Sequence, residues 1–283
     1  MNDSTNDNSP SVLVGRRRFL ALGGLTVASA AALSACGGSS SSGSVARVGL
    51  APVRTSLPEA VVNDVVLLRT AASLERSIAA AYADVIGNTE LLAAEYEDAA
   101  VRFRADHEAN AEAIDDIVTG LGGEPWPCGN PRVDLLVVGA MFTQIEGDEA
   151  AGIKPSDDPQ RDVLNMLHGL ETMATQSHQS FVAQLSDPEL RKAVITVGAQ
   201  EARHAAYLAM RITGVPDGYV PPADPPADAP KIPVVYAIPA PFGQLGGEQI
   251  VVGAENEDGV RRAFNLDTPS LNTFVYENLT PEC

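Results

Sequence analysis

Five side chains able to bind a metal ion fall on the apolar faces of four predicted helices: Glu75, His107, Glu171, Glu201 and His204. Glu201 and His204 are three residues apart, so both side chains point to one side of a helix. A carboxylate on a core-facing position is costly to bury unless it gains a partner. A metal ion is one such partner, and a metal-free network with other buried polar groups is another. We expect the five side chains to converge near the middle of a helical bundle.

Residues 57–213 contain the helices that must position these side chains. A short turn joins the first helix to the second and the third to the fourth, which predicts two antiparallel hairpins. Residues 124–160 form a long, Pro-interrupted connection with one short helix near residues 133–145. The fold predicted is therefore all-α, a four-helix bundle with one long crossover. The predicted helices run from Leu57 to Gly87, from Thr89 to Gly120, from Arg161 to Leu185, and from the Ser186–Glu189 cap to about residue 213.

This arrangement resembles the ferritin-like superfamily, in which two helices each carry one Glu and the other two each carry Glu-x-x-His. Glu75 and Glu171 match the single Glu positions, and Glu201-Ala202-Arg203-His204 matches one Glu-x-x-His. The second helix departs from the pattern, because His107 and Asn110 stand where the family has Glu and His. The resemblance covers residues 57–213. It implies one or two ions of iron or another divalent metal, and any enzyme activity would be of a ferroxidase or oxidoreductase type.

The first 36 residues resemble a bacterial export signal. Arg16 and Arg17 begin a stretch similar to the twin-arginine motif, and residues 19–35 carry no charge. The alternative interpretation of this apolar run is a membrane-spanning helix. The run is shorter than the ~20 residues that such a helix needs. The run ends at Cys36 after a small residue, as in a lipobox, so we expect a lipid on this Cys. Residues 37–56 then form a flexible tether, and the protein would stand on the outer face of the cell membrane or in the cell envelope.

The charge of the chain limits its partners. The full sequence has 19 Lys and Arg against 37 Asp and Glu. Removing residues 1–35 leaves 16 against 35, so the body is strongly acidic. An acidic surface repels nucleic acid and anionic lipid headgroups. We therefore expect two partners, the twin-arginine export machinery and the membrane, which the protein contacts through its lipid anchor. The sequence does not decide whether the chain forms homo-oligomers.

Residues 214–283 differ in composition from the helical part. A Pro-rich linker is followed by short β-like runs near residues 233–238, 249–254, 261–265 and 272–276, which predict a small β appendage on the bundle. With Cys36 acylated, only Cys128 and Cys283 remain. In an oxidising compartment we expect them to form a disulfide, the alternative being two free or intermolecularly paired thiols.

Two functions from different classes fit these features. The first is a lipid-anchored ferritin-like protein that binds iron or another divalent metal, in metal handling or oxidative-stress defence. The second is a metal-free, non-catalytic envelope scaffold or binding protein with a degenerate ferritin-like site. Bound metal in the purified protein favours the first function, and a buried polar network without metal favours the second.

Overall fold

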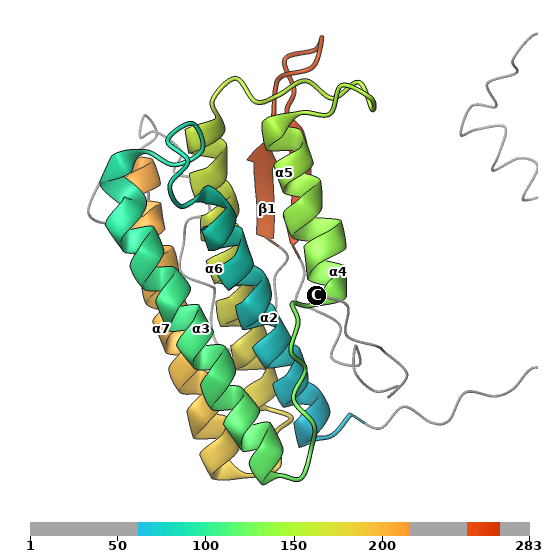
Figure 1. Cartoon of the computed structure of the whole chain (residues 1–283), viewed down its shortest axis with the longest axis vertical. Helices are drawn as coiled ribbons and strands as arrows, with labels where there is room; N and C mark the ends of the chain where they lie inside the picture. The colour runs from blue at the N-terminus through green and yellow to red at the C-terminus, as the bar shows by residue number, and fades with distance from the viewer. Residues whose placement is uncertain (1–61, 215–247, 267–283) are drawn as a thin grey trace, which may run out of the picture. The chain divides into compact units, whose positions relative to one another are not determined.

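The computed structural model describes residues 62–214 and 248–266, and the predicted export signal, the predicted tether and the predicted Pro-rich linker lie outside these ranges. The described residues form a helical bundle with a two-stranded antiparallel sheet (Figure 1). The elements are α2 (Asp64–Val85), η1 (Ala94–Tyr96), α3 (Glu97–Gly120), α4 (Pro131–Val133), the π-helical η2 (Asp134–Val138), α5 (Gly139–Glu146), α6 (Pro159–Val182), α7 (Pro188–Thr213), β1 (Glu248–Val252) and β2 (Arg262–Leu266).

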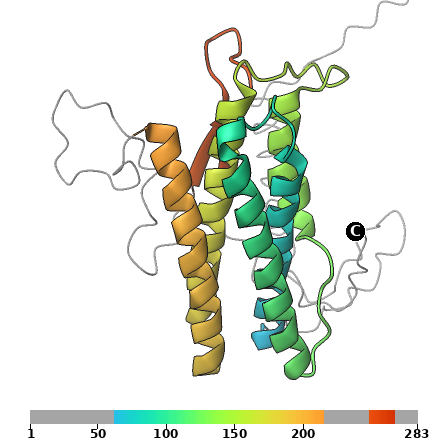
Figure 2. The ribbon, with the colours of Figure 1, turned by 60° about the vertical axis from the view of Figure 1, so that its left-hand side comes forward.

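The two predicted hairpins are present. Figures 1 and 2 both show α2 beside α3 and α6 beside α7, with the short α4–α5 segment between the two pairs in the chain. Asp187 caps α7 by accepting a hydrogen bond from the Glu189 amide, and Gly214 ends this helix in the left-handed conformation. The predicted all-α bundle with one long crossover and a small β appendage is confirmed.

Two predicted helix starts are wrong. The first long helix begins at Asp64, because the Asn63 side chain accepts the Val66 amide at 3.0 Å and caps the helix there. The second begins at Glu97 rather than at Thr89. The residues from Thr89 to the start of α3 include a turn in which Leu91 and Leu92 pack against the core. These two side chains are 6% and 1% exposed. Burial of two Leu side chains in this turn outweighs the local preference of Thr89 for a helix cap.

Asn130 fastens the crossover to α2. Its amide lies 3.1 Å from the Ser73 carbonyl and 2.8 Å from the Ser77 hydroxyl, and its side-chain amide donates to the Ser73 hydroxyl at 3.1 Å. The Asn130 side-chain oxygen also accepts the Arg132 and Val133 amides and caps α4. Asn130 is fully buried, so these bonds replace those it makes with water in the unfolded chain.

The β appendage rests on α6. A Cβ at Gly169 would lie 1.6 Å from Ile250 Cδ1, so only glycine lets the strand approach the helix this closely. The buried Asp162 carboxylate accepts the Gly253 amide at 2.6 Å and fixes the end of β1 to the start of α6. Of the four predicted β runs, the two near residues 249–254 and 261–265 are strands, and the other two lie outside the described residues.

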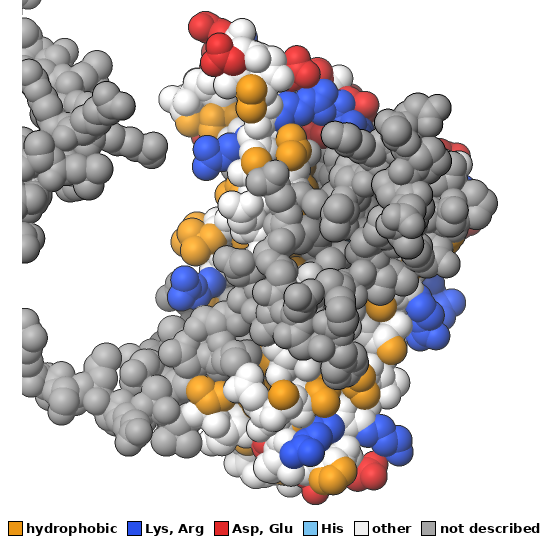
Figure 3. Space-filling model, turned by 180° about the vertical axis from the view of Figure 1, so that it is seen from behind, with side chains coloured by type: hydrophobic (Ala, Val, Ile, Leu, Met, Phe, Trp, Pro, Cys, Tyr) orange, Lys and Arg blue, Asp and Glu red, His pale blue; other side chains and the backbone are white. Residues whose placement is uncertain are grey.

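The bundle interior contains two apolar clusters. One surrounds Leu74, Tyr82 and Leu170 and includes the inner face of the β appendage, and the other lies toward the α2 N-terminus around Leu68 and Phe181. All four histidines of the chain are at most 4% exposed, and no His side chain is visible on the face in Figure 3. Among the described residues, no helix is both long and apolar enough to cross a membrane.

Candidate metal centre

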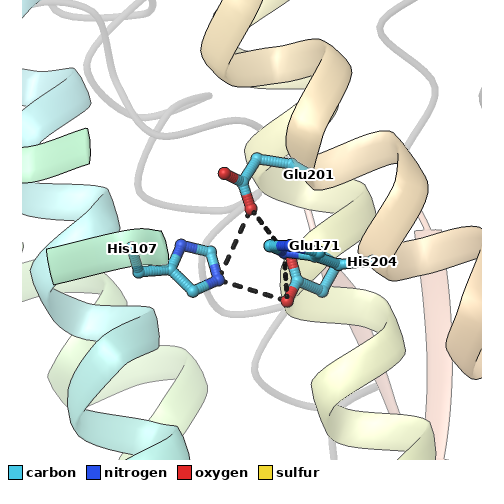
Figure 4. Close-up of side chains that lie close together, drawn as sticks. All are labelled: His107, Glu171, Glu201 and His204. Atoms are coloured by element: carbon cyan, nitrogen blue, oxygen red, sulfur yellow. Dashed lines mark hydrogen bonds and ion pairs between the residues drawn. The ribbon is translucent and has the colours of Figure 1, made fainter. Parts of the chain in front are cut away.

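Four of the predicted side chains meet inside the bundle. His107 comes from α3, Glu171 from α6, and Glu201 and His204 from α7 (Figure 4). One ligand atom from each lies within 4.8 Å of the others, and none of the four residues is more than 4% exposed. Adjacent donor atoms are evenly spaced: His107 Nε2 to Glu171 Oε1 is 3.1 Å, and His107 Nε2 to Glu201 Oε2, His204 Nδ1 to Glu171 Oε1 and His204 Nδ1 to Glu201 Oε2 are each 3.4 Å.

Glu75, the fifth predicted side chain, lies on the other side of the His107 ring. Its Oε2 is 2.8 Å from His107 Nδ1, and the opposite ring nitrogen, Nε2, faces Glu171 and Glu201. A carboxylate that accepts the Nδ1 proton of a histidine fixes the tautomer and leaves Nε2 able to bind a metal. In this structure Glu75 therefore orients His107, and its other oxygen points elsewhere.

Neighbouring side chains hold the imidazole and carboxylate groups in place. The Phe103 ring stacks on His204 with centroids 4.0 Å apart, and Asp106 Oδ2 lies 3.3 Å from His204 Nε2, which leaves Nδ1 facing the centre. The Tyr82 hydroxyl donates to Glu171 Oε1 at 2.6 Å, and its ring stacks on that of His107. The four donors are therefore positioned by packing before any ion binds.

Asn110 lies beside the four donors, at the position where the second helix departs from the Glu-x-x-His pattern. Its side-chain amide donates to Glu201 Oε1 at 3.0 Å and lies 3.5 Å from Glu75 Oε2. The amide therefore links two buried carboxylates and offsets part of their negative charge. A neutral amide is a weak ligand for a transition metal, so we assign Asn110 no ligand role.

Burial and charge act in opposite directions on the titrating groups. Burial lowers the pKa of His107, but attraction to Glu201, Glu171 and Glu75 outweighs this effect and raises that pKa well above its usual value. For His204, burial also lowers the pKa, but the neighbouring Glu171 and Glu201 carboxylates, each 3.4 Å from Nδ1, raise it to about 9. Burial, followed by repulsion from Glu75, raises the pKa of Glu201 well above its usual value. Without an ion, protons thus neutralise part of the cluster.

The chemistry of the donor set fits a transition-metal ion. Two of the four facing donor atoms, Glu201 Oε2 and His204 Nδ1, are buried and make no hydrogen bond with any described residue. Leaving such groups unsatisfied costs about 1–3 kcal/mol each. An ion about 2.0–2.2 Å from each ligand requires adjacent donors roughly 3.0–3.5 Å apart. The measured spacings of 3.1–3.4 Å lie within this range.

His178 is a buried neighbour that the sequence did not assign to the predicted site. It stands seven residues after Glu171, which is two helical turns along the same face of α6. Its Nε2 lies 3.3 Å from Glu75 Oε1. The spacing of seven from Glu171 was the signal in the sequence that could have found it.

The other predicted sites depend on residues outside the described ranges. Arg16, Arg17, Cys36 and Cys283 all fall there. Cys128 is described, and it lies buried in a small cluster with Val66 and Trp126 at the start of the crossover. The structure therefore places one cysteine of the predicted disulfide.

A four-helix bundle in which facing helices contribute buried Glu and His side chains is an architecture in which metal sites are built. A family model described as a ferritin-like domain matches residues 63–213 of this chain. This match spans more than half of the 283 residues, and the chain belongs to the ferritin-like family. No curated protein matches the chain, and no solved structure matches it.

Proposed function

We propose that this protein binds iron or another divalent transition metal through His107, Glu171, Glu201 and His204, and acts in metal handling or oxidative-stress defence at the cell envelope. The observation that carries the proposal is the set of buried atoms without hydrogen bonds, Glu201 Oε2 and His204 Nδ1 above all, at metal-ligand spacing. Buried polar atoms are normally hydrogen-bonded, and an ion at this point would complete the coordination of both atoms.

Each donor has a distinct role in this proposal. Glu171 and Glu201 supply two negative charges, and the two imidazoles supply nitrogen donors that suit iron, zinc and copper. The bound ion would supply Lewis-acid or redox chemistry according to its identity. Tyr82 and Asp106 keep Glu171 and His204 oriented through the hydrogen-bond contacts described above. Because ligands bind in their deprotonated forms, loading the site releases protons.

A metal-free scaffold is the second candidate function, and one observation favours it. His107 places both ring nitrogens within 3.1 Å of carboxylate oxygens, from Glu75 on one side and Glu171 on the other. A protonated His107 would donate to both and neutralise part of the buried charge without an ion. The two candidates differ in whether metal changes the stability of the fold.

The test is a thermal unfolding experiment on the purified protein, after chelation and after addition of zinc, manganese or ferrous iron. An ion that binds only the folded state stabilises that state in proportion to the logarithm of its concentration. We expect a concentration-dependent rise in the unfolding temperature with at least one of the three ions. Unchanged unfolding with all three, together with no metal in the isolated protein, would support the scaffold function instead.

We further propose that the twin-arginine signal exports the protein and that a lipid on Cys36 anchors it. The support is the sequence itself, an Arg pair and an uncharged run ending at this cysteine. Cys36→Ala should yield protein that no longer fractionates with membranes after a salt wash. Replacing Arg16 and Arg17 by Lys should block export. Membrane retention of the Cys36 variant would contradict the anchor, and export of the double-Lys variant would indicate the general secretion route.

A disulfide between Cys128 and Cys283 completes the proposal for the exported form. The chain entropy of so long a loop corresponds to ~5 kcal/mol of stabilisation in simple models, with smaller values common in practice. The burial of Cys128 beside Trp126 is compatible with a covalent anchor for the last residues. Peptide mapping without reductant should recover a linked pair. Two alkylatable thiols in the native protein would contradict it.

A further inference from the structure

The two-stranded sheet has one edge that borders no strand in the part of the chain that the structure describes. β1 lies against α6, where Ile250 packs over Gly169, and β2 pairs with β1 in antiparallel register. The second edge of β2, along Ala263 and Phe264, faces away from β1. The edge of a sheet presents backbone N–H and C=O groups that can pair with another strand. This edge is therefore a surface on which a further strand can dock.

Both faces of the sheet carry apolar side chains in rows that lead toward this edge. On the face that packs on the bundle, Ile250 lies opposite Phe264, and the Phe264 side chain is only partly buried. On the other face, Val251 lies opposite Ala263, and both side chains are exposed. Apolar pairs between neighbouring strands stabilise a sheet. A third strand with apolar residues on both faces would extend the two rows.

The chain contains a matching segment directly after β2. Residues 272–276 read Asn-Thr-Phe-Val-Tyr, and β-branched and aromatic residues of this kind favour strands. The five residues 267–271 connect this segment to β2, and Pro269 among them suits the second position of a tight turn. Loops of this length are common in hairpins. A short loop also costs less entropy to close than the pairing of a distant segment.

We propose that residues 272–276 dock on the second edge of β2 as an antiparallel third strand, with Phe274 opposite Phe264 and Val275 opposite Ala263. The five-residue loop sets this register. Phe274 then extends the apolar row on the face toward the bundle, and Val275 extends the row on the opposite face. A slip of one residue would turn each of these side chains to the wrong face, so burial on the bundle side specifies the register.

Arg262 supports the same pairing. Its guanidinium carbon lies 5.7 Å from the centroid of the Phe264 ring, two residues along the same strand. In the proposed register, Tyr276 stands directly opposite Arg262, with the two Cβ atoms about 4.5–5.5 Å apart. A guanidinium group is attracted to the faces of aromatic rings. The third strand would therefore give this exposed cation a second aromatic neighbour.

Paired cysteines in the full chain test the register. Directly opposite residues of an antiparallel pair have Cα atoms about 4.5–5.5 Å apart, a distance that a disulfide spans. Ala263→Cys with Val275→Cys should therefore form a disulfide within one chain under mild oxidation, detected by peptide mapping without reductant. Ala263→Cys with Thr273→Cys is the matched control, because diagonal positions lie about 7–8 Å apart. The control should form at least about tenfold less of the linked peptide.

Amide hydrogen exchange gives a second readout in which β2 keeps its own sequence. Phe274→Asp places a charge on the face toward the bundle and should release the third strand, so the amides of β2 should exchange at least about tenfold faster than in the wild type. Phe274→Leu keeps an apolar side chain and should retain the wild-type protection. Unchanged exchange in α6 shows that both variants remain folded.

The results distinguish the possible occupants of this edge. A link within one chain in the Val275→Cys pair alone, with faster exchange of β2 in Phe274→Asp, is the result expected. Equal linkage in both pairs, or no linkage in either, would overturn the proposal. Links between the Ala263→Cys positions of two chains would overturn it in favour of a second copy at the edge. Unchanged protection of β2 in Phe274→Asp would overturn it in favour of another segment.

Discussion

Two layers of the same bundle are both buried, but only one of them contains polar atoms that lack hydrogen-bond partners among the described residues. The apolar layer is a cluster of buried hydrophobic side chains, and the polar layer contains several atoms without hydrogen bonds to any described residue. Both are built by α2, α3, α6 and α7. The apolar layer includes Leu67, Leu68, Ala71, Ile114, Phe181, Leu185 and Val194, and the polar layer includes Glu75, His107, Glu171, His178, Glu201 and His204.

In the function proposed above, the apolar layer serves stability and the polar layer serves metal binding. Close packing of apolar side chains is enough to stabilise the apolar layer, which needs no bound ion. The second layer brings carboxylates and imidazoles into a low-dielectric interior, where they raise and lower one another's pKa. The fold tolerates this layer because the apolar layer stabilises the helices that carry it. We therefore expect substitutions in the apolar layer to change the free energy of unfolding, and substitutions in the polar layer to change the stabilisation gained on adding metal.

The largest effect should come from the apolar layer. Leu68→Ala removes a side chain that is fully buried and leaves a cavity, at a cost of about 2–5 kcal/mol in unfolding free energy. Denaturant titration measures this loss. The stabilisation gained on adding metal should be the same as in the wild type, since no donor is touched. A reduced metal effect in this variant would show that the two layers are not independent.

The fold was largely predictable from the sequence because helical periodicity and caps are local signals. Asp187 and Gly214 define α7 through contacts within a few residues of themselves. The true start of α3 was not predictable in this way, because burial of Leu91 and Leu92 is a tertiary effect. The same limit applies to the site. Helical phase placed Glu75 on the inner face, but only three-dimensional packing places it behind the His107 ring.

The next largest effect should come from the polar layer. Glu171→Gln keeps the shape of the side chain and removes one charge and one donor. In the wild type, free metal at a hundredfold excess over the dissociation constant adds about 2.7 kcal/mol of stability. The variant should lose this gain in thermal unfolding. Glu108→Gln, on the solvent-exposed side of α3 next to His107, is the control and should keep it. Equal loss in both would point to non-specific binding by acidic groups.

The rise in unfolding temperature on adding metal should become larger as the pH increases. The pKa of His204 is raised to about 9, above its unfolded value of about 6.5. Its protonated form therefore stabilises the metal-free protein fully below about pH 6.5, and this contribution is lost as the pH rises through 9. Metal competes with that proton, so the rise in unfolding temperature should be larger at about pH 8 than at about pH 6. An equal or smaller rise at the higher pH would argue against His204 as a ligand.

The smallest effect is expected at the altered position of α3. Asn110→His replaces a weak donor, which now links Glu75 and Glu201, by an imidazole. We expect metal affinity to increase by up to about tenfold, equivalent to about 1.4 kcal/mol. Titration of the chelated variant with Zn²⁺ measures the change. Weaker binding than in the wild type would show that the amide bridge between the carboxylates matters more than an added nitrogen.

The central claim is that His107, Glu171, Glu201 and His204 bind a transition-metal ion, and metal content tests it most directly. The chelated full chain is incubated with ferrous iron, manganese or zinc, desalted and analysed for metal per chain. We predict at least about one equivalent of one of these metals in the wild type and almost none in Glu171→Gln. A wild type that retains no metal, or a variant that retains as much as the wild type, would contradict the claim.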